Sequence, residues 1–219
     1  MFFPKVCEAC NMVLVDEKLV ICVKCRHQLP VTNFHFENSE DVKKIVYGRV
    51  KLENATALLH FSKKGIVQQL LHNLKYRGHR HISAFLGKWL GDELSTIEAY
   101  KAIDVVVPVP LYKTKLRKRG YNQVADFGKE IAKALNVAYN DKILVKTKAT
   151  KTQVFKGRLT RWNDDGALFD ISEEKSLIGK HILLVDDIIT TGATVEACAT
   201  ELLKIDNIKL SLATMAIAD

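Results

Sequence analysis

Residues 182–194 read Ile182-Leu183-Leu184-Val185-Asp186-Asp187-Ile188-Ile189-Thr190-Thr191-Gly192-Ala193-Thr194, and this stretch decides the fold. Its opening run of Ile, Leu and Val predicts a fully buried strand, which the two aspartates close. A small polar loop follows, and from Thr194 to about Lys204 the apolar residues recur at helical spacing. This order is typical of a phosphate site in an α/β protein, because the backbone N–H groups and the dipole at the helix start favour an anion.

The two adjacent carboxylates need a separate explanation, because they repel each other and a bound phosphate. They are explained if they bind neutral hydroxyls, or a divalent metal ion that is itself bound to the ligand. A sugar with two hydroxyls and a 5′-phosphate fits both halves of the stretch. The alternative is a strand end whose aspartates cap the next helix, but capping needs one Asp, whereas two aspartates and three threonines are present.

The stretch resembles the phosphoribosyl pyrophosphate (PRPP) motif of type I phosphoribosyltransferases over some dozen positions. The resemblance implies that Asp186 and Asp187 bind the ribose 2′ and 3′ hydroxyls, with magnesium bound to the PRPP. It implies that the loop binds the 5′-phosphate through Thr190, Thr191, Gly192, Ala193 and Thr194. The chain has no Gly-x-x-x-x-Gly-Lys, which excludes a Walker A loop, and a Rossmann fingerprint would need three glycines where this loop has one.

Length and composition limit the number of domains, the type of ligand and the expected location of the protein. The chain has 219 residues, enough for one large domain or for a medium domain and a small module. Its net charge of +8 suits a polyanionic ligand, either PRPP or a nucleic acid. No apolar run approaches the 18 residues of a membrane span, and Met1–Lys5 lacks the apolar core of a signal peptide, so a cytoplasmic protein is expected.

Four cysteines near the N-terminus form two Cys-x2-Cys pairs, Cys7 with Cys10 and Cys22 with Cys25, separated by eleven residues. Four thiolates in this arrangement suit a tetrahedral structural zinc, whereas disulfides are the alternative and are rare in the cytoplasm. The unit is too short for a hydrophobic core of its own, and zinc can supply the missing folding free energy. The fifth, Cys198, lies on the apolar side of the expected last helix and is assigned to the core.

The remaining pattern alternates strands and helices. Strands are expected at 55–61, 103–107, 143–145 and 209–215, and helices behind Ser62 as N-cap, at about 81–95 and around 124–135. Residues 31–50 are expected to be a linker. The turn with His72, His79 and His81 is interpreted as a basic exposed connection rather than a metal site. The alternation predicts a mostly parallel sheet with right-handed crossovers.

Two basic blocks flank the expected site. Lys113–Arg119 contains five cations in seven residues and follows a strand's carboxyl end, where open α/β sheets place ligands. Residues 146–161 contain no acidic residue, and so long a loop is typical of a lid. We expect contacts to pyrophosphate or DNA, with a solvated face as the alternative. The expected contact residues are Lys113, Lys115, Arg117, Arg119, Lys151, Arg158 and Arg161.

Three features together resemble the ComF family of competence-associated phosphoribosyltransferase-like proteins, along essentially the whole chain. They are the four-cysteine module, Val107–Pro110 with Arg117–Gln123, and Thr152-Gln153 ahead of the aspartates. The resemblance implies a type I phosphoribosyltransferase-like sheet with helices on both faces at 37–219, and a zinc-ribbon-like module at 1–36. It implies a role in single-stranded DNA uptake or handling during natural transformation, with competence proteins as partners.

Two departures from the enzyme pattern matter. Residues 108–112 take the pyrophosphate-loop position, but two prolines there remove backbone donors, so the cations of Lys113–Arg119 are expected to bind the pyrophosphate. Thr190 occupies the position where hypoxanthine-guanine enzymes carry an Asp general base, which disfavours that specificity. Tyr112 and Tyr121 flank the basic run, where base stacking and packing are both open.

Two functional hypotheses therefore remain. One is a PRPP-dependent phosphoribosyltransferase of nucleotide metabolism with a small nitrogen acceptor. The other is a DNA-handling protein that retains a site for PRPP or another ribose 5-phosphate. The intact motif supports ligand binding in both, whereas the basic run and the four-cysteine module favour the second.

Overall fold

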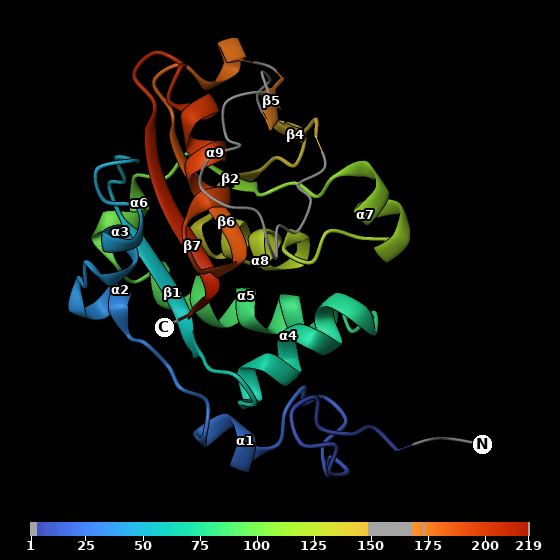
Figure 1. Cartoon of the computed structure of the whole chain (residues 1–219). Helices are drawn as coiled ribbons and strands as arrows, with labels where there is room; N and C mark the ends of the chain where they lie inside the picture. Colours follow the sequence, from blue (N-terminus) through green and yellow to red (C-terminus); the bar gives the residue numbers. More distant parts are fainter. Residues whose placement is uncertain (1–3, 149–167, 173, 219) are drawn as a thin grey trace.

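A five-stranded parallel sheet lies at the centre of the computed structural model, which describes residues 4–148, 168–172 and 174–218 (Figure 1). The strand order is β1-β7-β6-β2-β3, and every pairing in this sheet is parallel. The bounds are β1 Ala55–Phe61, β2 Val105–Pro108, β3 Ala138–Tyr139, β6 His181–Ile189 and β7 Lys209–Ala218. The expected parallel sheet is confirmed, and the acidic pair lies on its central strand.

Side chains alternate between the two faces of the sheet, and helices cover both. Leu183 and Val185 of β6 pack in the layer of α4 (Ile66–Tyr76), α5 (His81–Leu94) and α8 (Ala125–Leu135). Ile182 and Leu184 pack on the opposite side with α9 (Ala193–Leu202) and with the antiparallel pair β4 (Leu144–Lys146) and β5 (Phe169–Ile171). The expected helices on both faces are therefore confirmed (Figure 1).

The helices α5 and α8 lie unusually close together because glycine removes a side chain between them. A Cβ on Gly87 would lie 2.5 Å from the carbonyl oxygen of Phe127, closer than real atoms approach. The tight contact places α8 against β2, and the loop before α8 then reaches the acidic pair. Packing of α8 thus helps to position the site.

Some local expectations were wrong. Residues 31–50 are not a linker: they form α2 (Phe34–Glu37) and α3 (Asp41–Ile45), because Phe34, Val42 and Val46 bury against the sheet. The helix expected behind Ser62 begins at Ile66 with Gly65 as its N-cap.

The sheet edges and the acidic strand also differ from expectation. β4 pairs outside the main sheet, where two-residue β3 takes the edge instead. β6 does not close at the aspartates, because Ile188 and Ile189 continue its ladder with β7.

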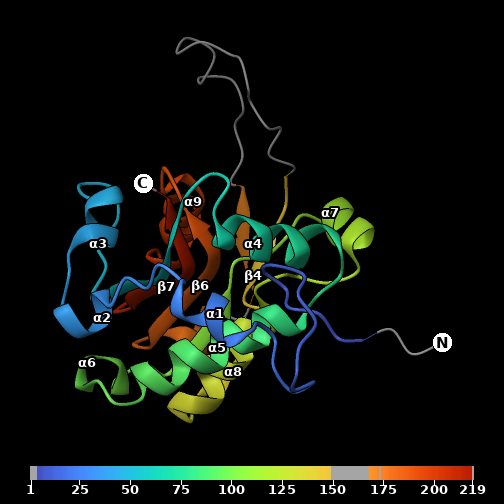
Figure 2. The ribbon, with the colours of Figure 1, turned by 90° about the horizontal axis from the view of Figure 1, so that it is seen from below.

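Short helices complete the described chain. They are α1 (Val23–His27) in the cysteine module, α6 (Glu98–Lys101), α7 (Lys113–Arg119) and the 3-10 turn η1 (Glu174–Leu177). The module lies below α4 and α5 in Figure 1 and in front of them in Figure 2, so the two views agree that it covers these helices. In the described part of the chain, no helix is long and apolar enough to cross a bilayer.

Candidate functional site

The acidic pair is buried at the carboxyl half of β6, and residues far away in sequence balance its charge. Asp187 Oδ2 accepts a hydrogen bond from Gln123 Nε2 at 2.9 Å and lies 2.9 Å from Lys75 Nζ. Lys75 comes from α4 and Gln123 from the turn before α8. The strand thus brings the pair into the core, and two elements of the same face supply the compensating donors.

Asp186 lies in a different environment from its neighbour. Burial, followed by the charge of Asp187, raises the pKa of Asp186 to about 8. The Asp187 N–H donates to Asp186 Oδ1 at 2.8 Å and acts in the opposite direction, as do the charges of Lys75 and Lys146. The raised pKa favours the protonated form of Asp186, which relieves the repulsion that two adjacent carboxylates would otherwise have.

The loop after β6 encloses a small cavity of about 40 Å³ lined by Asp186 and residues 188–195. Cavities for drug-sized ligands measure about 300–1,000 Å³, so only a small polar group fits here. Thr190, Thr191, Ala193 and Thr194 are exposed at its rim, and Gly192 is the N-cap of α9. Gly192 has φ +76°, and a Cβ there would lie 2.6 Å from Val46 Cγ1, so the loop requires glycine.

Arg49 ties this loop to α3, and nothing in the sequence pattern marked it. Its guanidinium donates to the Thr191 carbonyl oxygen at 2.9 Å, to the Ile45 carbonyl oxygen and to the Glu196 carboxylate. These contacts cross from the segment expected to be a linker to the first turn of α9. A cation therefore lies directly beside the proposed phosphate loop.

The basic run Lys113–Arg119 forms α7, and its side chains are exposed except for the partly buried Arg119. Arg119 donates to Gln123 Oε1, the residue that also contacts Asp187. Lys115 is near enough to Lys146 to lower its pKa, after burial as the larger cause. Lys113 and Arg117 are exposed, and the expected contacts Lys151, Arg158 and Arg161 lie outside the described residues.

The segment expected to take the pyrophosphate-loop position is bound to the sheet. Pro108 ends β2, and the Val109 N–H donates to the Val185 carbonyl oxygen at 2.9 Å. Asn122 Nδ2 donates to the Val109 carbonyl oxygen at 2.9 Å. The backbone groups of Val109 therefore stabilise the segment beside β6.

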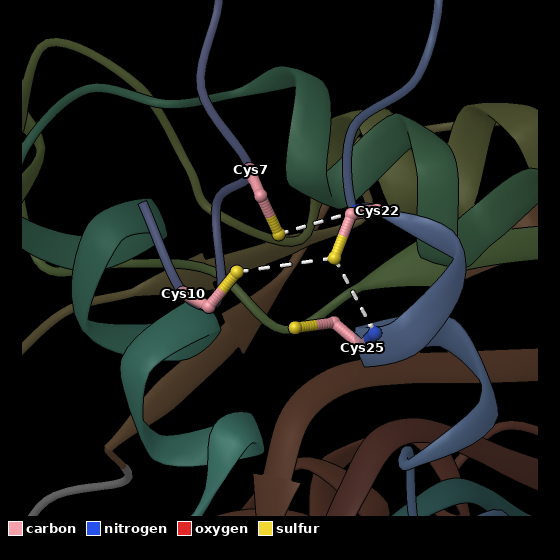
Figure 3. Close-up of side chains that lie close together, drawn as sticks. All are labelled: Cys7, Cys10, Cys22 and Cys25. Atoms are coloured by element: carbon pink, nitrogen blue, oxygen red, sulfur yellow. Dashed lines mark hydrogen bonds between the residues drawn. The ribbon is translucent and has the colours of Figure 1, made fainter. Parts of the chain in front are cut away.

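The four cysteine side chains converge on one point, as Figure 3 shows. Their sulfur atoms all lie within 4.8 Å of one another, and Cys10 Sγ lies 3.8 Å from Cys22 Sγ. A tetrahedral zinc site with Zn–S bonds of about 2.3 Å has S–S edges of about 3.8 Å. All four cysteines are free thiols in this structure, so the donor set fits a tetrahedral metal ion.

Glu8 joins the module to the rest of the protein. Its buried carboxylate lies 2.6 Å from His79 Nδ1 and 2.7 Å from His81 Nε2, and Asn73 Nδ2 donates to its backbone oxygen at 2.9 Å. The histidine turn is therefore more than the exposed connection expected: two of its rings bind a carboxylate that lies between two metal-ligand candidates.

The family described as the phosphoribosyl transferase domain matches residues 125–219, which include β6, the loop and α9. The DNA utilization protein YhgH of Escherichia coli O157:H7 is 26% identical over 203 residues, covering 91% of this chain and 84% of that protein. Competence protein F of Haemophilus influenzae is 29% identical over 106 residues, covering 48% of this chain and 46% of that protein.

Among solved structures, a glutamine PRPP amidotransferase from B. subtilis, complexed with ADP and GMP, is 18% identical with a TM-score of 0.42. The match covers 64% of this chain and 30% of that chain. The two sequence relatives and the domain match agree with the parallel sheet and the strand–loop–helix described above. The chain is therefore similar to the DNA utilization and competence proteins, and its carboxyl-terminal part matches the phosphoribosyl transferase domain, in agreement with the resemblance to the ComF family.

Proposed function

We propose that the protein binds PRPP, or another ribose 5-phosphate, at the carboxyl end of β6 and takes part in handling single-stranded DNA. The observation that carries the ligand proposal is the buried acidic pair directly ahead of a small cavity at the start of α9. The ribose 2′ and 3′ hydroxyls donate to Asp186 and Asp187. The 5′-phosphate binds Thr190, Thr191, Gly192, Ala193 and Thr194, where the helix start favours an anion.

In this proposal Lys75 and Gln123 are positioning residues for Asp187. Each lies 2.9 Å from Asp187 Oδ2, so the carboxylate is oriented before a ligand arrives. Arg49 positions the loop through Thr191. Such preorganisation reduces the ordering cost of binding.

Magnesium is the proposed partner of the ligand rather than a resident ion. Carboxylate oxygens are ligands of the type that magnesium accepts, and Asp186 and Asp187 are the residues that would face it, with Asp186 giving up its proton when the ion binds. Bound magnesium would neutralise charge on the pyrophosphate. The chain's own cations in α7 supply further positive charge at the same edge of the sheet.

Thermal melting with PRPP and magnesium, added separately and together, tests the ligand proposal. Ligand at 100 times its dissociation constant stabilises by about 2.7 kcal/mol. The double variant Asp186→Asn/Asp187→Asn is expected to lose the shift, whereas Asp16→Asn, on the exposed surface of the cysteine module, keeps it. Absence of any shift at millimolar PRPP in the unaltered protein would overturn the proposal.

The metal of the four-cysteine module is proposed to be a structural zinc held by Cys7, Cys10, Cys22 and Cys25. The mutual distances of the sulfur atoms support this assignment. All four positions of a tetrahedral ion are then taken by protein sulfur, so no open position remains for chemistry. Zinc here stabilises the module against α4 and α5.

The DNA proposal rests on charge and on the relatives' names. One relative is a DNA utilization protein and another a competence protein. The net charge of +8 and the exposed cations of α7 suit the phosphates of a strand. We propose a cytoplasmic role in DNA uptake or handling during natural transformation, with competence proteins as partners.

A PRPP-dependent transferase with a small nitrogen acceptor is the second candidate. It is favoured by the preoriented Asp187, because such transfer depends on positioning and charge neutralisation. Pyrophosphate release from PRPP, measured with a panel of amine and nucleobase acceptors, distinguishes the two. Release above the background of Asp187→Asn with one acceptor would establish the transferase.

A further inference from the structure

The helix α4 has an exposed ridge of polar and aromatic side chains that no function above uses. Gln68, His72 and Tyr76 recur every four residues and are exposed, whereas Val67, Leu70 and Leu74 bury on the other side. No residue of α4 is acidic. Residues four apart on a helix lie about 6 Å apart along its axis. The ridge therefore offers hydrogen-bond donors and ring faces in one line, without a carboxylate.

A cavity of about 410 Å³ lies along the ridge, between α4 and the cysteine module. Its lining includes the cations Lys64 and Arg77, the polar Gln69 and the small Ala9, and none of its lining residues is acidic. The nearby carboxylate of Glu8 is buried and bound to His79 and His81. Positive charge is thus uncompensated among the lining residues, which favours an anionic group.

Tyr76 is the last residue of α4, directly before Arg77, and is 72% exposed. The His72 ring lies 5.1 Å from its ring centroid, and the Arg119 guanidinium of α7 lies 5.9 Å from it. An exposed ring beside a cation is a typical platform for an unpaired base.

Tyr121, which the sequence suggested as a stacking residue, differs from Tyr76. It is partly buried, its hydroxyl donates to the Leu74 carbonyl oxygen, and Arg80 lies 5.4 Å from its ring. The Tyr121 side chain therefore packs the turn before α8 against α4, whereas the Tyr76 ring faces solvent.

We propose that a DNA single strand lies along this ridge, from the Lys64–Arg77 cavity to Tyr76 and then onto α7. The inference rests on the proposed DNA role and specifies its binding surface. Phosphates bind Lys64 and Arg77, and a base stacks on Tyr76. The Arg119 guanidinium at the end of α7 lies 5.9 Å from the Tyr76 ring, so the ridge meets the basic helix at this contact.

The ridge also leads to the candidate ribose phosphate site. Lys75, the residue before Tyr76, lies 2.9 Å from Asp187 on the inner side of the same helix turn. A strand on the ridge therefore passes within one residue of the group that orients the acidic pair. This proximity connects the two halves of the proposed function through a single helix.

The test measures fluorescence anisotropy of a labelled fifteen-nucleotide oligo-dT at several salt concentrations. Tyr76→Ala is expected to weaken binding about tenfold, and Tyr76→Phe to bind as the unaltered protein does, because stacking needs the ring and not the hydroxyl. Tyr47→Ala is the matched control, since Tyr47 is 85% exposed after α3 and away from the ridge. The slope of the logarithm of the binding constant against the logarithm of the salt concentration is expected to become shallower by about 1.4 in Lys64→Ala/Arg77→Ala. This is about 0.7 for each of the two phosphates that lose a cation.

The possible outcomes distinguish failure of the proposed binding surface on α4 from failure of the proposed DNA role. If the unaltered protein binds no DNA at low salt, the proposed DNA role fails and the ridge with it. If it binds, and Tyr76→Ala and Lys64→Ala/Arg77→Ala bind with unchanged affinity and salt slope, the DNA role stands and the ridge is overturned. A loss restricted to Lys115→Ala/Arg117→Ala would then place the strand on α7 alone. Unchanged melting temperatures show that each variant is folded.

Discussion

The four-cysteine module and the acidic pair of β6 both gather groups that become anionic, yet they are stabilised differently. The sulfur atoms of the module lie close to one another and to backbone N–H groups, as between the Cys22 N–H and Cys7 Sγ at 3.2 Å. In the acidic pair, Lys75 and Gln123 contact Asp187 instead, and burial raises the pKa of Asp186. One cluster fits an external cation, whereas the chain itself compensates the other.

The way in which each cluster is stabilised indicates which of the two regions needs a bound ligand in order to fold. The pair lies on the central strand of a sheet with a core on each face, so its environment forms without a ligand. The module contributes only a few buried side chains, among them Leu14, Ile21 and Leu29, to the core shared with α4 and α5. Its local structure therefore depends on the proposed metal.

The largest expected effect is the loss of that metal. Cys22→Ser is expected to release one zinc per chain and to unfold the module, because metal binding contributes about 10–16 kcal/mol in zinc-finger peptides. The sheet is expected to stay largely folded, with new dye-accessible apolar surface on α4 and α5. Elemental analysis measures the metal, and Cys198→Ala, which alters the buried cysteine of α9, should keep it. Reduced, unaltered protein without stoichiometric zinc would refute the assignment.

The second prediction removes the cation that compensates the charge of the buried Asp187 carboxylate. Lys75→Met leaves the Asp187 carboxylate buried without its cation, so the free energy of unfolding is expected to fall by about 3 kcal/mol. Lys75→Met/Asp187→Asn should recover most of this loss in urea unfolding. The control pair Lys88–Asp92 is exposed at 69% and 59%, and Lys88→Met should cost less than about 0.5 kcal/mol. Equal losses at the two lysines would show that burial of the pair is unimportant.

A smaller effect tests the close packing of the phosphate loop. Gly192→Ala combines an unfavourable φ with a clash against Val46, whereas Gly78→Ala at φ +79° has no atom within 4 Å. The difference between their free energies of unfolding isolates the clash, and about 2 kcal/mol is expected. Equal destabilisation by the two alanines would mean that the loop moves away from α3 without cost.

The smallest effect is the pH dependence that Asp186 causes. Its folded pKa of about 8 lies above its ordinary value, so between about pH 4 and 8 the folded state retains a proton that the unfolded chain has lost. Stability from this group therefore falls as pH rises through that window, by at most about 1.4 kcal/mol per pH unit. Asp186→Asn should make the decline shallower when urea unfolding is compared at pH 6 and 7. Parallel curves for the two proteins would contradict the raised pKa.

The sequence alone predicted those features whose residues lie close together along the chain. Two Cys-x2-Cys pairs predicted the converging thiols, because the ligands of each knuckle are neighbours in the chain. The buried strand, polar loop and helix at 182–202 followed from apolar periodicity and one glycine. The alternation of strands and helices predicted the parallel sheet, since crossover helices must cover its faces.

Only the tertiary structure decided which distant residues complete the site. Lys75, Gln123 and Arg49 reach β6 and its loop from separate elements, and no local pattern distinguishes them from solvated surface residues. Residues 34–37 and 41–45 are helical because apolar side chains of this segment pack against the sheet, a contact that a short polar-rich segment does not reveal. The basic run became α7, and Tyr76 rather than Tyr121 became the exposed ring, because packing selects which side chains remain in solvent. Spacing along the chain determines which groups are neighbours, but burial and long-range contacts determine their charge and exposure.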